Sequence, residues 1–165
     1  MCILFLFLAS IASSEFAQCG AYAPQPRKES AVSQKAEGSF DVKVTPVPAD
    51  DKSDASIGRM TIDKQFHGDL EGTSKGEMLT AMSSVKGSVG YVAIEKVTGT
   101  LKGRKGTFVL QHNATMNRGT PSLHIEVVPD SGTGELEGLT GSMTIKIEAG
   151  GKHFYTFEYN LPQNK

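Results

Sequence analysis

Glu95 and His112 are the two residues of this sequence whose types and positions could do acid–base chemistry together. Each takes an inward position in a segment where apolar and polar residues alternate, so each is expected on the buried face of a β-strand. A buried carboxylate is costly unless it is paired, and an imidazole is a suitable partner. The pair could transfer protons or anchor a polar group at the floor of a ligand cavity. The alternative is a structural ion pair that fixes strand register.

The register of the predicted hairpin 91–116 decides whether these two side chains meet. With a four-residue loop at 102–105, Glu95 lies directly opposite His112, and the Cβ atoms of such a pair are ~4.5–5.5 Å apart. Tyr91 then shares the inner face with Glu95. We expect burial to raise the pKa of the Glu95 carboxyl and a protonated His112 to lower it.

Aromatic residues gather on one face of the last alternating segment, residues 153–161. Tyr155, Phe157 and Tyr159 would either fill the interior or line an apolar pocket there. A buried tyrosine hydroxyl needs a hydrogen-bond partner, so these tyrosines could bond Glu95 or hold an oxygen atom of a ligand. The candidate ligand-binding residues are therefore Glu95, His112, Tyr91, Tyr155 and Tyr159.

Other chemistry has little support in the sequence. The four histidines, at positions 67, 112, 124 and 153, show none of the spacings typical of a metal site, so no metal is expected. A phosphate-binding loop, a dinucleotide-binding motif and a nucleophile elbow are missing, and no cofactor is expected. With 17 Lys and Arg against 18 Asp and Glu, the net charge is -1, which argues against nucleic acid as a partner.

The elements that must position these residues are β-strands. From Gly38 onward apolar and polar residues alternate in about eight segments, separated by turns rich in Gly and Pro. One buried face per strand favours antiparallel neighbours. The sequence thus predicts an all-β fold, an antiparallel eight-stranded closed barrel, which either packs its interior or holds one small ligand. Residues 77–85 could form a strand end or a short helix.

The chain is expected to have three parts. Residues 1–19 form a signal-like apolar leader, residues 20–37 a disordered linker and residues 38–165 the barrel domain. The apolar run of the leader is too short to span a bilayer and suits a secretory signal, although no Lys or Arg precedes it. We expect a secreted or periplasmic protein with no stable membrane span after leader cleavage, or a cytoplasmic one if the leader is not a functional signal.

Several blocks of the domain, in order along the chain, resemble an uncharacterised, mainly bacterial family. The blocks are GSFDVKVTPVP, GRMTIDKQFHGDLEGTSKGEML, GYVAIEKVTGTLKGRKGTFVLQH, PDSGTGELEGLTGSMTI and HFYTFEY. The family carries only a domain-of-unknown-function label, DUF3224, and has no established reaction. The resemblance runs from about Gly38 to Leu161 and implies a barrel like that of allene oxide cyclase, which dirigent proteins share. A shared fold does not by itself imply a shared function.

Three functions remain open. The first is a binding protein that captures a small hydrophobic or amphipathic ligand in the barrel. The second is a cyclase or isomerase, in which the barrel orients a flexible substrate and Glu95 or His112 moves a proton. The third is a structural protein with a filled core that forms a homo-oligomer through outward apolar residues such as Val92 and Ile94. An inner cavity of ~300 Å³ or more would favour the first two.

Overall fold

The computed structural model describes residues 33–48 and 56–162. These residues form strands and no helix, and hence no helix that could cross a membrane. The strands are β1 (Gln34–Val47), β2 (Ile57–Gly68), β3 (Leu70–Met82), β4 (Val89–Leu101), β5 (Arg104–Asn117), β6 (Thr120–Val127), β7 (Thr133–Gly134), β8 (Thr140–Ile147) and β9 (His153–Asn160). The predicted alternation is visible in β4, where Ala93, Glu95 and Val97 are buried and the residues between them are exposed.

Eight of these strands close into an antiparallel barrel. Hydrogen-bonded neighbours follow the order β4–β3–β2–β1–β9–β8–β6–β5, and β5 pairs with β4 to complete the ring. The short β7 pairs with β5 at Gly106 and Thr107, beyond the end of β6. The predicted all-β fold, an antiparallel eight-stranded closed barrel, is confirmed.

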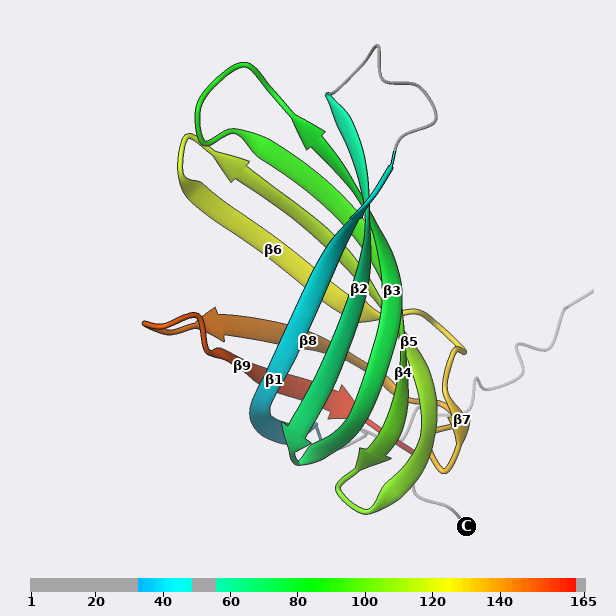
Figure 1. The fold of residues 1–165 in the computed structure, drawn as a ribbon. Coiled ribbons are helices and arrows are strands. Elements are labelled where there is room, and N and C mark those ends of the chain that lie inside the picture. The colour runs from blue at the N-terminus through cyan, green and yellow to red at the C-terminus, as the bar shows by residue number, and fades with distance from the viewer. Residues whose placement is uncertain (1–32, 49–55, 163–165) are drawn as a thin grey trace, which may run out of the picture.

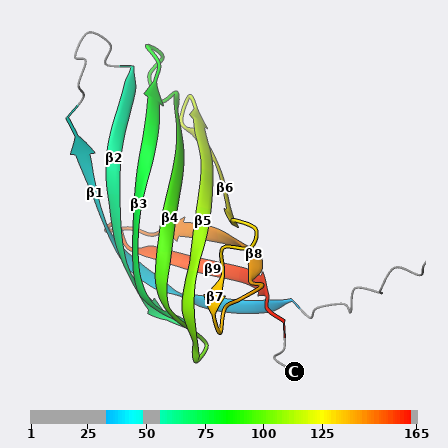
Figure 2. The same ribbon diagram turned by 90° about the vertical axis from the view of Figure 1, so that its right-hand side faces the viewer.

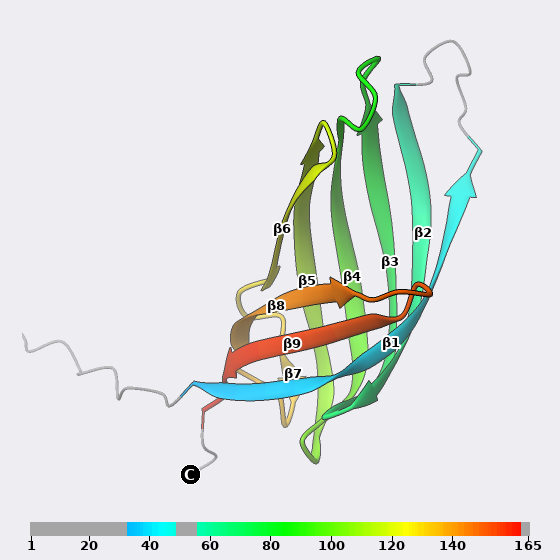
Figure 3. The ribbon, with the colours of Figure 1, turned by 90° about the vertical axis from the view of Figure 1, so that its left-hand side faces the viewer.

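The barrel is complete over only part of its length (Figures 1 and 3). β8 and β9 cross the long strands near one end, and β9 pairs with the first half of β1, over residues 34–40. Beyond Phe40, β2 is the one described strand that pairs with β1. On the other side, β6 meets β8 through one residue pair, Glu126 and Ser142. One end of the barrel is therefore covered, and the other is not.

The closed end, as we call the covered part, contains the hydrophobic core. Phe157 stacks on Phe108 there, with ring centroids 5.7 Å apart. Leu136 and Leu139, from the segment between β6 and β8, are fully buried and join the core. Side chains thus fill this end, as expected of a close-packed interior. Its other largest buried residues are Phe66, Leu70, Leu101 and Tyr159.

The open end consists of the parts of β2 to β6 that β8 and β9 do not cross (Figure 3). Its inner face carries Met82, Val89 and Met116, which pair in turn across β3, β4 and β5. Leu123 on β6 takes the inward position opposite Ala114. Except for Ala114, these residues are exposed although they lie on the same face as the core residues.

The turn between β4 and β5 is tighter than predicted. Leu101 pairs with Arg104, which leaves Lys102 and Gly103 as the turn residues, and their φ angles are 46° and 86°. Positive φ at both central residues is typical of a type I′ hairpin turn. The predicted four-residue loop is therefore wrong, and the pairs along the hairpin shift by two residues.

The structure also defines the start of β1 and the form of residues 77–85. β1 begins at Gln34, so residues 34–37, predicted as linker, belong to the barrel. Residues 77–85 form the end of β3 as far as Met82, followed by a turn, and not a helix. The leader 1–19 and the linker up to residue 32 lie outside the described residues.

Candidate functional site

Four polar side chains from neighbouring strands form a buried cluster between the closed and the open end. Lys64 comes from β2, Ser74 from β3, Glu95 from β4 and His112 from β5, and each residue is at most 7% exposed. Each takes an inward position in the alternation of its strand. We call these four residues the polar cluster.

The carboxylate of Glu95 is the centre of the polar cluster. Lys64 Nζ donates a hydrogen bond to Oε1 at 2.8 Å, and His112 Nε2 lies 3.1 Å from the same oxygen. The Ser74 hydroxyl donates to Oε2 at 3.0 Å. The predicted meeting of Glu95 and His112 is therefore present. Lys64 and Ser74 were not predicted from the sequence, although Lys64 alternates in phase with the apolar residues at 62 and 66.

Glu95 and His112 are diagonal neighbours rather than directly opposed. Glu95 pairs with Leu110, and His112 pairs with Ala93. A register shift of two residues keeps both side chains on the inner face, because side chains alternate with a period of two. The side chains of Glu95 and His112 are long enough to meet across the diagonal.

The surroundings of Glu95 keep it ionised. Burial alone would raise the pKa of its carboxyl, but the hydrogen bond from His112 and the charge of Lys64 outweigh burial and lower the pKa to about 2. The Lys64 ammonium also lies 4.9 Å from the centroid of the Phe40 ring, a cation–π contact. A carboxyl with this pKa holds almost no proton at neutral pH, so Glu95 is poorly suited to general acid catalysis.

The three candidate tyrosines lie in different places. Tyr91 is half-buried on the inner face of β4, and burial together with the carboxylate of the polar cluster raises its pKa. Tyr155 and Tyr159 are buried at the closed end. The Leu70 N–H donates to Tyr155 Oη at 2.8 Å, and Tyr159 Oη donates to Gln34 Oε1 at 3.1 Å. The structure therefore does not bring Tyr155 or Tyr159 to the polar cluster.

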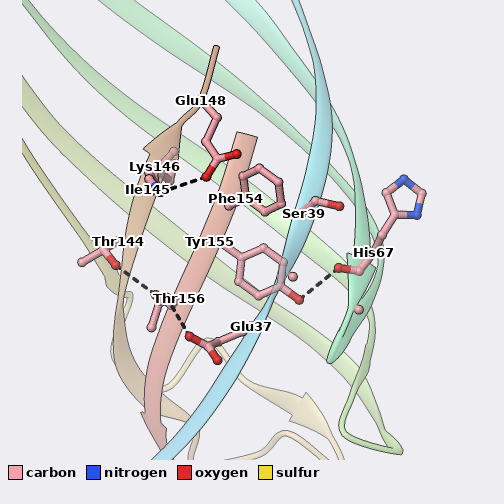
Figure 4. Close-up of a pocket in the computed structure, with 12 residues that line it drawn as sticks. Glu37, Ser39, His67, Thr144, Ile145, Lys146, Glu148, Phe154, Tyr155 and Thr156 are labelled. Atoms are coloured by element: carbon pink, nitrogen blue, oxygen red, sulfur yellow. Dashed lines mark hydrogen bonds and ion pairs between the residues drawn. The ribbon is translucent and has the colours of Figure 1, made fainter. Parts of the chain in front are cut away.

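A hollow of about 470 Å³ opens on the outer side of β1, β8 and β9 (Figure 4). Phe154 supplies its aromatic surface, and the backbone and ring of Tyr155 lie below. Its Lys and Glu side chains are paired: Lys146 Nζ lies 2.8 Å from Glu148 Oε1, and Lys35 Nζ lies 2.7 Å from Glu37 Oε1. This hollow was not predicted from the sequence, since Phe154 takes an outward position in β9.

A second hollow, of about 530 Å³, lies near the turn between β8 and β9 and includes Asp41, Gly151 and His153. Neither hollow is lined by Glu95 or His112. The predicted cavity floor at these two residues is thus occupied by the polar cluster's own side chains. Contact of Glu95 or His112 with a ligand stays a prediction.

Methionines gather on the inner face of the open end. Met60 pairs with Met78 across β2 and β3, and Met82 and Met116 flank Val89. Met82 is 64% exposed and Met116 is 38% exposed, while Met60 and Met78 are half-buried. This surface was not predicted from the sequence, although the methionines follow the period-two pattern of their strands.

These methionines line the inner face as an apolar wall. Thioethers suit a soft ion such as Cu(I), but Met78 and Met82 are four residues apart on β3, which is ~13 Å along a strand. Groups this far apart cannot share one ion. Within residues 33–48 and 56–162, no group of three or more His, Cys, Asp or Glu residues could hold a metal.

Comparison with known proteins places this barrel in a family. The model of a family described as a protein of unknown function, DUF3224, matches residues 36–159. A crystal structure of a DUF3224 protein of unknown function from Shewanella oneidensis, at 1.84 Å resolution, is similar with a TM-score of 0.74. The two sequences are 52% identical, over 81% of this chain and 100% of that one. A search of curated proteins gives no match. The likeness to allene oxide cyclase stays a prediction, but the family match spans most of the chain, and this chain belongs to the DUF3224 family.

Proposed function

We propose that this protein binds a small hydrophobic or amphipathic molecule on the inner face of its open end. The observation that carries the proposal is the exposure of apolar side chains that point inward: Met82 is 64% exposed, Leu123 40% and Val89 38%. Exposed apolar groups on neighbouring strands favour a partner that removes them from water. The strands curve toward this face above β8 and β9 (Figures 1 and 3), so a small molecule there would meet protein on more than one side.

The side chains of this wall suit an apolar ligand body. Met, Val and Leu offer dispersion contacts without charge, and flexible methionines adapt to ligands of different shape. Tyr91, half-buried on the same face, offers a hydroxyl for a polar atom of the ligand. The polar cluster below is paired within itself and needs no ligand charge. A charged head group would therefore stay toward solvent.

The cyclase or isomerase hypothesis has less support. Glu95 is 0% exposed, both of its carboxylate oxygens accept hydrogen bonds, and its pKa is lowered to about 2. A proton-transfer group works best with a pKa near the working pH and within reach of the substrate. The geometry of Glu95 fits an ion pair that holds strands together better than it fits proton transfer.

We also propose that the protein is exported. The support is the apolar run between Ile3 and Ile11, which has the length of the hydrophobic part of a secretory signal. The mass of the intact protein isolated from its native cells measures this directly. A mature chain that lacks the leader is expected, whereas a chain that retains it and stays in the cytoplasmic fraction would contradict export.

Binding of N-phenyl-1-naphthylamine, an uncharged dye that fluoresces in apolar surroundings, tests the ligand site. We expect saturable binding to the full-length protein. Met116→Glu and Leu123→Glu should each weaken binding at least about tenfold, because a carboxylate in the wall must lose its hydration when the dye covers it. Val92→Glu is the matched control, since Val92 has similar exposure but faces outward, and it should bind the dye like the wild type.

Two results would overturn the ligand proposal. One is the lack of saturable dye binding by the wild type. The other is an affinity of both inner-face variants equal to that of the wild type. Native mass spectrometry of the protein from its own compartment then identifies the natural ligand, as a small-molecule adduct that Leu123→Glu does not retain.

A further inference from the structure

The hollow of about 470 Å³ on the outer side of β1, β8 and β9 combines one aromatic ring with polar groups on both sides of it (Figure 4). We call it the outer hollow. Phe154 on β9 pairs with Ser39 of β1 on one side and with Lys146 of β8 on the other. Thr156 and Glu37, which pair with each other, follow along β9 and β1. The volume lies within the range of ~300–1,000 Å³ that is typical of small-molecule sites. Figure 2 shows β8 and β9 on the side of the barrel away from the long strands.

Hydroxyl and carboxylate groups lie around the Phe154 ring. Thr156 Oγ1 donates to Glu37 Oε1 at 3.4 Å, a long hydrogen bond that a ligand hydroxyl can replace. The half-buried Ser39 hydroxyl has no hydrogen-bond partner among residues 33–48 and 56–162. A carboxylate accepts up to about four hydrogen bonds, so Glu37 and Glu148 can each accept more than their lysine partners donate. The outer hollow therefore offers donors and acceptors to a ligand that carries several hydroxyl groups.

The charges at the outer hollow are balanced. Its two glutamates each lie against a lysine, at 2.7 and 2.8 Å. His67 Nε2 lies 3.1 Å from Asp41 Oδ2, and Asp41 lines the second hollow together with Lys152 of opposite charge. No charge of either sign is in excess among these side chains, so the site has no electrostatic preference for a cation or an anion.

The second hollow continues the outer hollow. The two share Ser39, His67 and Phe154 in their linings. The second hollow lies where β1 leaves β9, after Phe40, and reaches the turn at Gly151. A ligand that lies against Phe154 can therefore extend into both hollows.

We propose that the outer hollow binds a neutral saccharide, with one pyranose ring on Phe154 and the next ring in the second hollow. A pyranose has C–H groups on one face, which pack on an aromatic ring, and hydroxyl groups around its edge, which need donors and acceptors. An apolar ligand would cover the hydroxyl and carboxylate groups without satisfying them, which is costly. A charged ligand would find no counter-charge that is not already paired.

The saccharide proposal goes beyond the ligand proposal for the open end and is independent of it. Phe154 takes an outward position in β9, whereas Tyr91, Met116 and Leu123 take inward positions in β4, β5 and β6. None of these three inward residues lines either hollow. A substitution at one site therefore leaves the other site in place.

Saturation-transfer difference NMR of the full-length protein with cellobiose, maltose and lactose tests the saccharide site. We expect saturable binding of at least one of these disaccharides. Phe154→Leu keeps an apolar side chain and removes the aromatic ring, and it should raise the dissociation constant at least about fivefold. Phe154→Tyr keeps the ring and should bind the sugar like the wild type.

Leu123→Glu is a further control, because it adds a charge at the open end and should bind the sugar like the wild type. Circular dichroism verifies that each variant keeps the fold. A wild type that binds none of the three disaccharides overturns the proposal. A folded Phe154→Leu variant that binds as tightly as the wild type also overturns it. Dye binding is read separately, so either proposal can fail while the other stands.

Discussion

β4 and β5 bury their inward residues at one end of the barrel and expose them at the other. At the closed end Leu101 and Phe108 are at most 1% exposed, whereas Val89 and Met116, near the other ends of the same strands, are each 38% exposed. Residue type does not explain the contrast, because all four are apolar and share one face. The difference is the cover by β8 and β9, which cross the closed end alone (Figure 1). Burial in this barrel therefore depends on which strands lie opposite.

The polar cluster lies where the two ends meet. Its four members join β2, β3, β4 and β5 through hydrogen bonds to one carboxylate, that of Glu95. On the closed side of the cluster, apolar packing holds these strands together. On the open side little packs against them, so we expect the cluster to fix the register of these strands where the apolar packing ends. The predictions below test this division of roles.

Alanine substitutions at the two ends should differ most in stability. Phe157→Ala removes a fully buried ring from the closed end and should lower the free energy of unfolding by about 3–5 kcal/mol. Met82→Ala removes a side chain that is 64% exposed at the open end and should cost less than about 1 kcal/mol. Urea denaturation at neutral pH measures both. Equal losses for the two variants would show that the ends do not differ as described.

Removing one charge of the polar cluster should also be costly. Lys64→Met leaves the buried Glu95 carboxylate without its ammonium partner and should lower the free energy of unfolding by about 3–5 kcal/mol. The double variant Lys64→Met/Glu95→Gln removes both charges and should regain most of that loss, since a neutral pair needs no counter-charge. Urea denaturation of the wild type, of Lys64→Met, of Glu95→Gln and of the double variant forms a double-mutant cycle. The cycle gives the coupling free energy between Lys64 and Glu95. A double variant no more stable than Lys64→Met would contradict the ion-pair role.

Acid should destabilise the barrel through Glu95. Its folded-state pKa of about 2 lies below the ordinary value of 4.5, so the ionised form stabilises the fold above about pH 5, and this stabilisation is lost as the pH falls toward 2. The shift corresponds to about 3 kcal/mol. Thermal unfolding followed across this pH window measures the loss. The Lys64→Met/Glu95→Gln variant should show a flatter pH profile, and an equally steep one would assign the acid sensitivity to other carboxyls.

The register of the β4–β5 hairpin shows how a local pattern can be correct and incomplete. Alternation placed Glu95 and His112 on one face, and the structure agrees. The predicted length of the loop was wrong because Lys102 takes a positive φ of 46°, a conformation that its residue type does not favour. The error was an even number of residues, so it preserved the faces and changed only the partners.

The start of β1 could not be predicted for a different reason. Lys35 and Glu37 are polar, and the inward Ala36 between them is small, so residues 34–37 resemble a linker. They are ordered as a strand because they pair with β9, more than a hundred residues later in the chain. No pattern within four residues carries that information.

The strand content, the positions of most strands along the chain and their alternating faces follow from the amino-acid sequence, because side-chain alternation and turn residues are local properties of the chain. The tertiary structure alone decided which inward residues are buried. It brought Lys64 and Ser74 to Glu95 and left Met82 and Leu123 exposed. Burial and pairing depend on strands distant in sequence, and their relative placement results from the packing of the whole barrel.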